Sequence, residues 1–398
     1  MKYEIKDDIL TVFLKGRIDS SNAKDTENEI LSILSDNPGC GMEFDAEGLE
    51  YISSAGLRTL MLVRKMLNRE MTIKNVSPDV YEIFSVTGFV RLFDVRRRLR
   101  EISVEGLPLI GAGANGRIYR LDRETIVKVY NPLTNPPEKI IREKETAKQA
   151  FIHGIPSAIS FDMVSVGDRY GIVYEMLDTE TLGAVIGNDS GHTEEYGVRM
   201  AKMLKRLHST EFDEGVLPDA RLGLHVWADV AEKSGCYEAE TISKLNSLID
   251  SIPPRNTFIH GDFHPANIMV RDGEWLLIDM GDASVGHPIV DLLGSYQIMK
   301  LVAERSNGAE RYTGLSSENL KRLWNAFVRE YFGVSGEGEV AKIEGILKYY
   351  AIIRSLAGVT FSDVIPAPVR QKLTQEVQTA FLTLYDKYGN TLLPALGL

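Results

Sequence analysis

The chain has 398 residues, of which 44% are hydrophobic and 25% charged, and its formal net charge is −11 at pH 7. This length accommodates two or three domains, and the composition excludes a largely disordered chain. No apolar run reaches the length of a membrane span, and the charged start lacks the apolar segment of a signal peptide. Cys40 and Cys236 lie far apart, which argues against a disulfide framework, so we expect a cytoplasmic protein.

The N-terminal part predicts an α/β domain in which strands alternate with helices. Strand-like runs cover 9–14, 42–45 and 71–76, and helical patterns cover 20–35 and 55–67. Such alternation places helices against one sheet. We assign residues 1–104 to this first domain.

A loop and two later motifs in this domain carry a family resemblance. The segment Leu49–Arg58 resembles the phosphorylation-site loop of STAS domains, the fold of bacterial anti-sigma factor antagonists. Asn75–Pro78 and Phe84–Phe89, the latter ahead of an expected last helix, fit the same family. The similarity covers about residues 1–100, so the resemblance implies a STAS-like regulatory or docking domain.

The chain departs from that family at the residue before Gly56. Phosphorylatable STAS domains carry serine or threonine there, by this resemblance, whereas this chain has Ala55. Ser53 and Ser54 are neighbouring hydroxyls, but neither takes the expected place. We therefore predict a docking or regulatory role without the usual phosphate switch.

One basic run, Arg96–Arg100, ends the first domain. Because the run is short, we interpret it as a solvated or interdomain helix rather than a nucleic-acid site.

A glycine-rich loop with Gly111, Gly113 and Gly116 opens the second part. The same Gly-x-Gly-x-x-Gly string occurs in dinucleotide-binding folds, where a helix follows it. Here the β-rich runs 117–121 and 125–130 follow and predict a hairpin. We therefore expect the glycines to form a mobile backbone flap over phosphates.

Lys128 lies in the second strand of that hairpin, where a kinase places the lysine that binds the α- and β-phosphates. The next helical stretch, about 137–150, supplies an acidic partner for it. We favour Glu143, but helical phase alone leaves Glu145 open.

The segment from His260 to Asn267 reads His-Gly-Asp-Phe-His-Pro-Ala-Asn, and Asp279 follows twelve residues later in Ile-Asp-Met-Gly. Phosphoryl transfer needs a carboxylate that orients the attacking hydroxyl and oxygen ligands that hold Mg²⁺ on the nucleotide. Asp262, Asn267 and Asp279 have these types, at the spacing of a kinase catalytic loop followed by Asp-x-Gly.

On these motifs the region from about 105 to 398 resembles the aminoglycoside/choline phosphotransferase family of kinase-like enzymes. Gly261 stands where protein kinases carry arginine, as is characteristic of that family. The resemblance implies an α+β bilobal kinase-like fold after the STAS-like domain. The N-lobe would span 105–178, and the helical C-lobe, with the acceptor site, 179–398.

The resemblance also implies roles for the loop residues. Asp262 would be the catalytic base, and Asn267 and Asp279 would be the Mg²⁺ ligands. His264 falls near the expected γ-phosphate and would assist there, whereas His260 would hold the loop. Of two acidic residues downstream, Asp282 and Asp291, we assign Asp291 to structure.

The segment Val173–Leu177 resembles a kinase hinge, which binds the purine through backbone groups of Glu175 and Leu177. Tyr174 precedes that glutamate, where a side chain faces the purine pocket and a wide ring narrows it. We expect ATP as the donor, with GTP as the alternative.

Two other functional classes compete with a small-molecule kinase. A signalling protein that phosphorylates protein would need a long activation segment, but 281–288 runs directly into the apolar stretch 289–293. A pseudokinase scaffold would have lost a site residue, and Lys128, Asp262 and the metal residues are all present. A small-molecule acceptor is therefore favoured.

The charge distribution bears on the partners. Residues 1–104 carry 15 Lys and Arg against 17 Asp and Glu, which leaves about −9 on the rest of the chain. An acidic second part disfavours nucleic acid as a partner. It favours a cationic acceptor, such as an amino sugar or a choline-like amine, although such charge also serves solubility.

Overall fold

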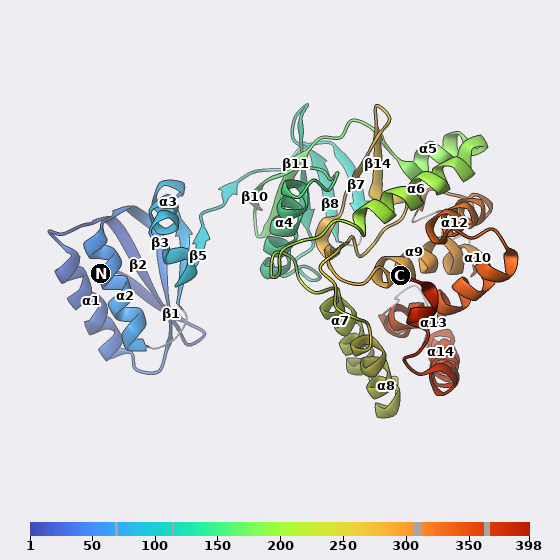
Figure 1. Cartoon of the computed structure of the whole chain (residues 1–398). Helices are drawn as coiled ribbons and strands as arrows, with labels where there is room; N and C mark the ends of the chain where they lie inside the picture. The colour runs from blue at the N-terminus through green and yellow to red at the C-terminus, as the bar shows by residue number, and fades with distance from the viewer. Residues whose placement is uncertain (68–70, 114, 306–309, 311–312, 362–366) are drawn as a thin grey trace. The chain divides into compact units, whose positions relative to one another are not determined.

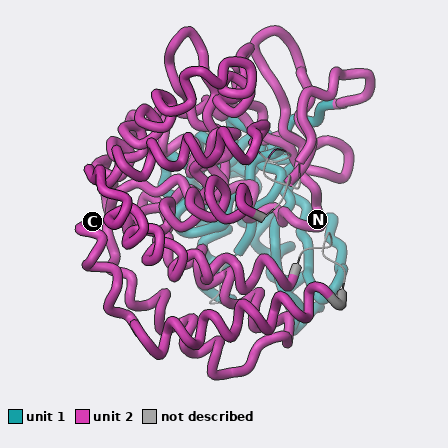
Figure 2. Tube along the Cα trace, turned by 90° about the vertical axis from the view of Figure 1, so that its right-hand side faces the viewer, with its two compact units in different colours: residues 1–102 teal, residues 103–398 magenta. Residues whose placement is uncertain are grey.

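The computed structural model describes residues 1–67, 71–113, 115–305, 310, 313–361 and 367–398. Ala114, within the glycine-rich string, lies outside the described residues. The chain forms two compact units, Met1–Ile102 and Ser103–Leu398 (Figures 1 and 2). Across the described ranges, none of the helices combines the length and apolarity needed to cross a membrane.

The first unit is a five-stranded sheet in the order β1-β2-β3-β4-β5. Strand β1 pairs antiparallel with β2, and the other neighbours pair in parallel. Because side chains alternate along a strand, β2 buries Leu10, Val12 and Leu14 in one core with Ile30 and Leu60 of two helices. The elements in chain order are β1 (Tyr3–Lys6), β2 (Ile9–Ile18), α1 (Ala23–Asp36), β3 (Gly41–Ile52), α2 (Ser54–Leu67), β4 (Thr72–Val76), α3 (Pro78–Val86), η1 (Phe89–Arg91) and β5 (Asp94–Arg97).

Two predictions for the end of this unit are wrong. No α-helix lies between Phe89 and β5, because the chain makes only the three-residue 3₁₀ helix η1 before it enters β5. The basic run 96–100 is likewise extended, with Arg97 in β5 and Arg100 in the two-residue strand β6 (Arg100–Glu101). β5 is the edge of the sheet, and charged side chains on an edge strand keep it solvated and discourage pairing with another chain.

Because the first unit buries its own core, residues 1–104 should fold without the rest of the chain. We expect the fragment to show a mixed α/β circular dichroism spectrum and a cooperative thermal transition. Phe44 is fully buried, so Phe44→Asp in the same fragment should abolish both signals. A random-coil spectrum for the unsubstituted fragment would show that the unit does not fold on its own.

The second unit begins with an antiparallel sheet in which β10, β11, β9, β8 and β7 are neighbours in that order. Helix α4 packs against β10 and β11 and carries the predicted partner of Lys128. The elements are β7 (Leu109–Gly113), β8 (Gly116–Arg120), β9 (Thr125–Tyr130), α4 (Pro137–Ile152), β10 (Ser160–Val166) and β11 (Arg169–Glu175).

The rest of the second unit is mainly helical around two small sheets, β12-β14-β15 and β13-β16 (Figure 1). Helices α6 and α12 pack together along their apolar stripes, burying Met200, Leu204, Leu323 and Phe327. The elements are β12 (Glu180–Thr181), α5 (Leu182–Asn188), η2 (Ser190–His192), α6 (Thr193–Leu207), α7 (Ala220–Lys233), α8 (Ala239–Asp250), β13 (Phe258–Ile259), η3 (Pro265–Asn267), β14 (Ile268–Arg271), β15 (Glu274–Leu277), η4 (Met280–Asp282), β16 (Ser284–Val285), α9 (Ile289–Tyr296), η5 (Gln297–Val302), α10 (Ala303–Arg305), α12 (Ser317–Phe332), α13 (Glu337–Phe361), α14 (Ala367–Tyr388) and η6 (Leu393–Leu396).

Candidate active site

A cavity of about 600 Å³ lies between the N-terminal sheet of the second unit and the strands β14 and β15. Much of its wall is apolar, with Ile118, Ile126, Met269 and Leu277, which suits a flat heterocycle. The predicted nucleotide and metal residues that line it are Gly111, Gly113, Gly116, Lys128, Glu143, Glu175, Leu177, Asn267 and Asp279.

The glycine loop folds as the hairpin of β7 and β8, with Gly113 opposite Gly116. At Gly116 a Cβ atom would come within 2.2 Å of the Val129 carbonyl oxygen, so only glycine fits there. In the hinge, the Glu175 N–H donates to the Ile159 carbonyl at 3.0 Å. The N–H of Glu175 is therefore already paired.

Lys128 bridges two carboxylates at one end of the cavity. Its Nζ lies 2.8 Å from Glu143 Oε1 and 2.8 Å from Asp279 Oδ1. Burial lowers the pKa of Lys128, but the charges of Glu143 and Asp279 outweigh it and raise the pKa. The structure places Glu143 rather than Glu145 at this lysine, since Glu145 pairs with Lys148.

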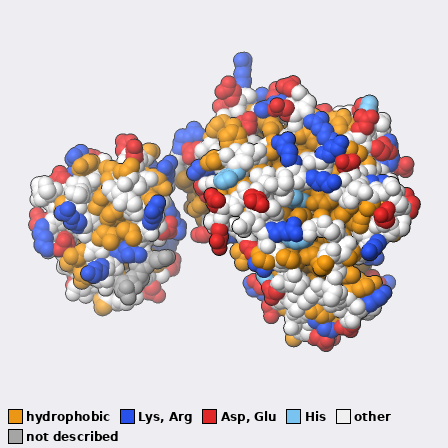
Figure 3. Space-filling view, in the orientation of Figure 1, with side chains coloured by type: hydrophobic (Ala, Val, Ile, Leu, Met, Phe, Trp, Pro, Cys, Tyr) orange, Lys and Arg blue, Asp and Glu red, His pale blue; other side chains and the backbone are white. Residues whose placement is uncertain are grey.

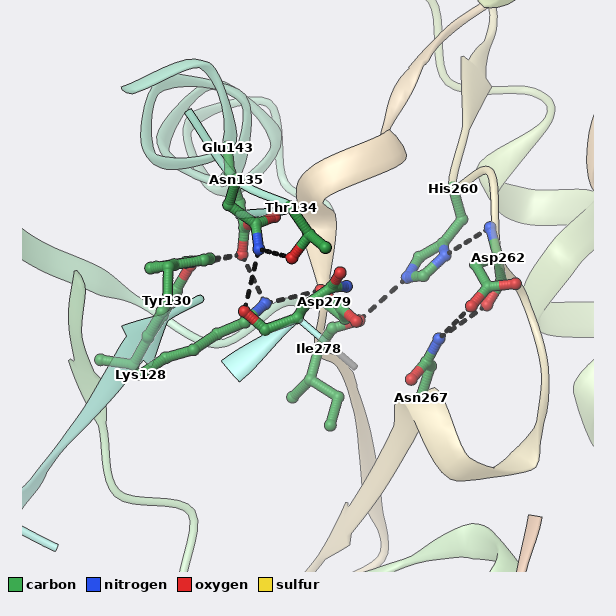
Figure 4. A network of polar contacts seen from close by, with 12 residues as sticks. Lys128, Tyr130, Thr134, Asn135, Glu143, His260, Asp262, Asn267, Ile278 and Asp279 are labelled. Atoms are coloured by element: carbon green, nitrogen blue, oxygen red, sulfur yellow. Dashed lines mark hydrogen bonds and ion pairs between the residues drawn. The ribbon is translucent and has the colours of Figure 1, made fainter. Parts of the chain in front are cut away.

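Two tyrosines fix Glu143 in this position. The hydroxyls of Tyr130 and Tyr174 donate to Glu143 Oε1 at 2.7 and 3.1 Å. Lys128 also donates to this oxygen, which therefore accepts three hydrogen bonds, and Figure 4 shows those from Lys128 and Tyr130. Burial, together with the Glu143 charge, raises the pKa of Tyr174, so the phenol stays protonated and remains a donor. The sequence did not reveal the contact of Tyr130 with Glu143, because it depends on how β9 and α4 come together in space.

Tyr174 lines the cavity beside Glu143, so it can influence the choice of purine. We expect Tyr174→Ala to shift the relative affinity from Mg-GTP toward Mg-ATP by roughly fivefold, or about 1 kcal/mol, because removing the ring enlarges the cavity there. Titration of both nucleotides measures the shift. Tyr174→Phe keeps the ring and should keep the preference. An unchanged ratio in Tyr174→Ala would dispose of the steric idea.

Neighbouring side chains of the predicted catalytic loop hold Asp262 in place. Asn267 Nδ2 donates to the Asp262 carbonyl at 2.8 Å and to Oδ2 at 3.2 Å (Figure 4). His264 Nε2 lies 3.2 Å from the same Oδ2. Burial raises the pKa of Asp262. The His264 contact and the charge of Arg354 together lower it by more, so the pKa falls below the ordinary aspartate value. A carboxylate of this kind stays ionised and orients a hydroxyl.

Asp291 anchors the start of this loop. Its fully buried carboxylate accepts the N–H groups of His260 at 2.9 Å and Gly261 at 2.6 Å, and contacts His208 Nε2 at 3.0 Å. His260 Nε2 lies 3.1 Å from the Ile278 carbonyl and ties the loop to the residue before Asp279. Both residues therefore serve the loop's shape, as the sequence suggested.

Gly261 is required by the backbone, which has φ = +85° there. A Cβ atom would also lie 2.6 Å from the Asp282 carbonyl oxygen. The glycine that distinguishes this loop from that of protein kinases thus permits close contact with the segment after Asp279.

The two predicted metal ligands offer oxygen atoms toward the nucleotide cavity. The Asn267 amide nitrogen points toward Asp262, which leaves Oδ1 for a cation (Figure 4). Asp279 has a left-handed backbone, with φ = 60°, and only Oδ1 is paired with Lys128. Mg²⁺ is commonly held by one or two protein oxygens plus phosphates and water, so this donor set fits it.

Arg354 of α13 was missed at the sequence level. Its Nη2 lies 3.4 Å from Asp262 Oδ1, and its positive charge also acts on the Asp282 carboxylate. Burial, then repulsion from Asp262, raises the pKa of Asp282. The available signal was a lone charge within the apolar stretch 349–357, a pattern that favours a functional or paired cation.

A glycine-rich hairpin, a lysine–glutamate pair and the Asp262 loop next to Asp279 are the features expected of a kinase-like phosphotransferase. Residues 106–320 match the phosphotransferase enzyme family, and residues 1–102 match the STAS domain. The chain belongs to the phosphotransferase enzyme family and carries an N-terminal STAS domain. Both resemblances and the expected fold class are confirmed.

The first unit is 36% identical over 92 residues to BtrV of Bordetella bronchiseptica, named for an anti-sigma factor antagonist role. The match spans 22% of this chain and 78% of BtrV.

Two solved structures are similar to the second unit. An aminoglycoside-3'-phosphotransferase of type VIII is 17% identical, with 63% of this chain and 94% of that one covered and a TM-score of 0.43. A choline/ethanolamine kinase family protein from Mesorhizobium loti is 13% identical, with 72% and 90% covered and a TM-score of 0.42.

Proposed function

We propose that the second unit transfers the γ-phosphoryl group of ATP, with GTP as the alternative donor, to a hydroxyl of a small molecule. The observation that supports this most directly is a continuous set of contacts. Lys128 contacts Asp279, the N–H of the preceding Ile278 donates to the Asn267 carbonyl at 3.1 Å, and the Asn267 amide donates to the Asp262 carboxylate. These are the positioning and charge-neutralising groups that phosphoryl transfer requires.

In the proposed reaction the acceptor oxygen forms a bond to the γ-phosphorus while the bond to the bridging oxygen breaks. The nucleoside diphosphate leaves, and the hydroxyl proton passes toward Asp262. Lys128 would hold the α- and β-phosphates, and Asn267 and Asp279 would hold Mg²⁺. That ion neutralises the charge that develops on the phosphate oxygens.

The acceptor is proposed to be small because little chain is available for a peptide platform. Only the short elements η4 and β16 separate Asp279 from α9, which starts at Ile289. The charge of about −9 on this part of the chain favours an amine-bearing acceptor, such as an amino sugar or a choline-like molecule. Acidic and basic side chains are interspersed on the face in Figure 3, so this preference is a diffuse one.

A screen tests the proposal. The full chain is incubated with Mg-ATP or Mg-GTP and a panel of amines, amino sugars and other small alcohols, and diphosphate release and product mass are measured. We expect acceptor-dependent release and a product heavier by one phosphoryl group. The proposal fails if Mg-nucleotide does not bind, or if bound nucleotide turns over independently of Asp262.

We propose that the first unit docks a protein partner and that the protein works in the cytoplasm. Cys40 and Cys236 lie in different units, so a disulfide framework is not expected, which suits a reducing cytoplasm. The loop before α2 supports docking rather than a phosphate switch. Ser53 Oγ accepts the N–H of Ala55 at 3.2 Å and so caps the helix, and Ala55 has no hydroxyl.

With alanine before Gly56, incubation with ATP and an anti-sigma-type serine kinase should leave the STAS domain unphosphorylated. Intact-mass spectrometry and peptide mapping measure this. Ala55→Ser restores a hydroxyl at the expected position and serves as the matched variant that should gain phosphate. Stoichiometric phosphate on Ser53 or Ser54 of the unsubstituted chain would contradict the expectation.

A further inference from the structure

Three separate elements fix the position of Arg354 beside the catalytic carboxylate. From the loop, Asp262 Oδ1 lies 3.4 Å from its Nη2. From α7, the Trp227 ring lies under the guanidinium, with 5.4 Å to the ring centroid. From α9, Gly294 leaves room for the guanidinium, because a Cβ atom at that position would come within 2.5 Å of Arg354 Nη1. The guanidinium is therefore placed by packing and is not a loose surface group.

Most donors of this guanidinium are unused. Arginine offers five N–H donors and no acceptor. Over the part of the chain that the structure describes, its hydrogen bonding consists of the single contact with Asp262 at 3.4 Å. The side chain is 16% exposed, and none of its nitrogen atoms is among the buried polar atoms of the described residues that lack a partner. The remaining donors therefore reach solvent, and a cation held in this position can bind an anion that arrives with a ligand.

Neutralising Asp262 does not account for this geometry. Asn267 and His264 already hold the carboxylate at 3.2 Å each. An arginine that served only as a counter-ion would form a close bidentate pair, and that pair would occupy the oxygens that must receive the acceptor hydroxyl. The long single contact leaves Asp262 accessible and keeps a positive charge beside it.

We propose that Arg354 binds an anionic group, a carboxylate or a phosphate, that lies next to the reacting hydroxyl of the acceptor. This inference rests on the proposed function, because it names the acceptor class of the same site. Amines elsewhere on the acceptor stay compatible with the overall acidic charge. During transfer the hydroxyl oxygen gains the phosphoryl group, and the anionic group remains chemically unchanged on Arg354.

Matched acceptors test the proposal with the full chain and Mg-ADP by calorimetry. Serine differs from ethanolamine by a carboxylate, glycerate differs from glycerol by a carboxylate, and glycerol 3-phosphate differs from glycerol by a phosphate. We expect at least one anionic member to bind roughly ten- to a hundredfold tighter than its partner. The glycerate and glycerol 3-phosphate arms separate carboxylate from phosphate. Equal binding within every pair overturns the proposal.

Variants of the arginine assign the effect. Arg354→Gln should remove the anion's advantage while keeping Mg-ADP affinity, and Arg354→Lys, which keeps the charge without the planar fork, should reduce it. The control is Arg322→Gln, which breaks an exposed pair with Glu194 and should change nothing. An advantage that persists in Arg354→Gln overturns the assignment. If Arg354→Gln does not fold, the assignment is overturned when Arg354→Lys still binds the anionic acceptor as much more tightly than its partner as the unsubstituted chain does.

The outcome is separable from that for the proposed function. Mg-ATP turnover that is lost in Asp262→Asn but shows no anion preference leaves the phosphotransferase proposal standing and refutes the role of Arg354. An anion preference without any turnover that depends on Asp262 supports the Arg354 site and refutes the phosphotransferase proposal.

Discussion

We expect Asp262→Asn to lower phosphoryl transfer by about 10²- to 10⁴-fold while the fold and most nucleotide affinity persist. The carboxylate acts on the acceptor hydroxyl, and its contribution is largest in the transition state. Asp262 is not among the residues that line the nucleotide cavity, so we expect nucleotide binding to depend little on its charge. Single-turnover transfer and calorimetric titration with Mg-ADP measure the two effects separately.

Asp279→Ala provides the contrast. Asp279 lines the cavity and contacts Lys128, so its loss should weaken Mg-nucleotide binding as well as transfer.

Because the pKa of Asp262 is held below the ordinary value, Asp262 stays ionised as pH falls toward about 4, the usual aspartate pKa. An acidic limb of the rate profile above that pH therefore belongs to another group. Near-wild-type transfer by Asp262→Asn would refute its role.

The parts of the site that lie close together in the chain could be predicted from the sequence. Asp262, His264 and Asn267 are within six residues, so their spacing already implies one loop. Arg354 reaches the same carboxylate from 92 residues away, and only the packing of α13 against α7 and α9 brings it there. The acceptor side of such a site is built from distant helices, which sequence spacing cannot join.

The same limit explains the errors in the first unit. Arg97 was placed in a helix because charge runs suit solvated helices, but β5 forms by pairing with β4, a partner about twenty residues earlier. Its guanidinium then lies 3.8 Å from the centroid of the Tyr81 ring, a contact that local sequence does not specify. Tertiary pairing therefore overrode the local preference.

Asp291→Asn should destabilise the protein by about 3 kcal/mol or more and abolish transfer. The two carboxylate oxygens of Asp291 accept two backbone N–H groups of the catalytic loop and contact His208 Nε2. An amide has one oxygen, so its NH₂ group would face one of those donors in a buried site, since Asp291 is 0% exposed. The loop that presents Asp262 would then lose its anchor. The free energy of unfolding in denaturant and the rate of transfer measure the change.

Asp250→Asn is the matched control, because Asp250 also pairs with a histidine, at 2.9 Å from His225 Nε2, but its side chain is 68% exposed. An exposed pair contributes about 0–1 kcal/mol, so stability and transfer should stay close to those of the unsubstituted chain. The comparison isolates burial and backbone anchoring from the histidine–aspartate contact itself. Equal losses in the two variants would mean that Asp291 acts only as a charge partner, and full transfer by Asp291→Asn would mean that the loop keeps its shape without this carboxylate.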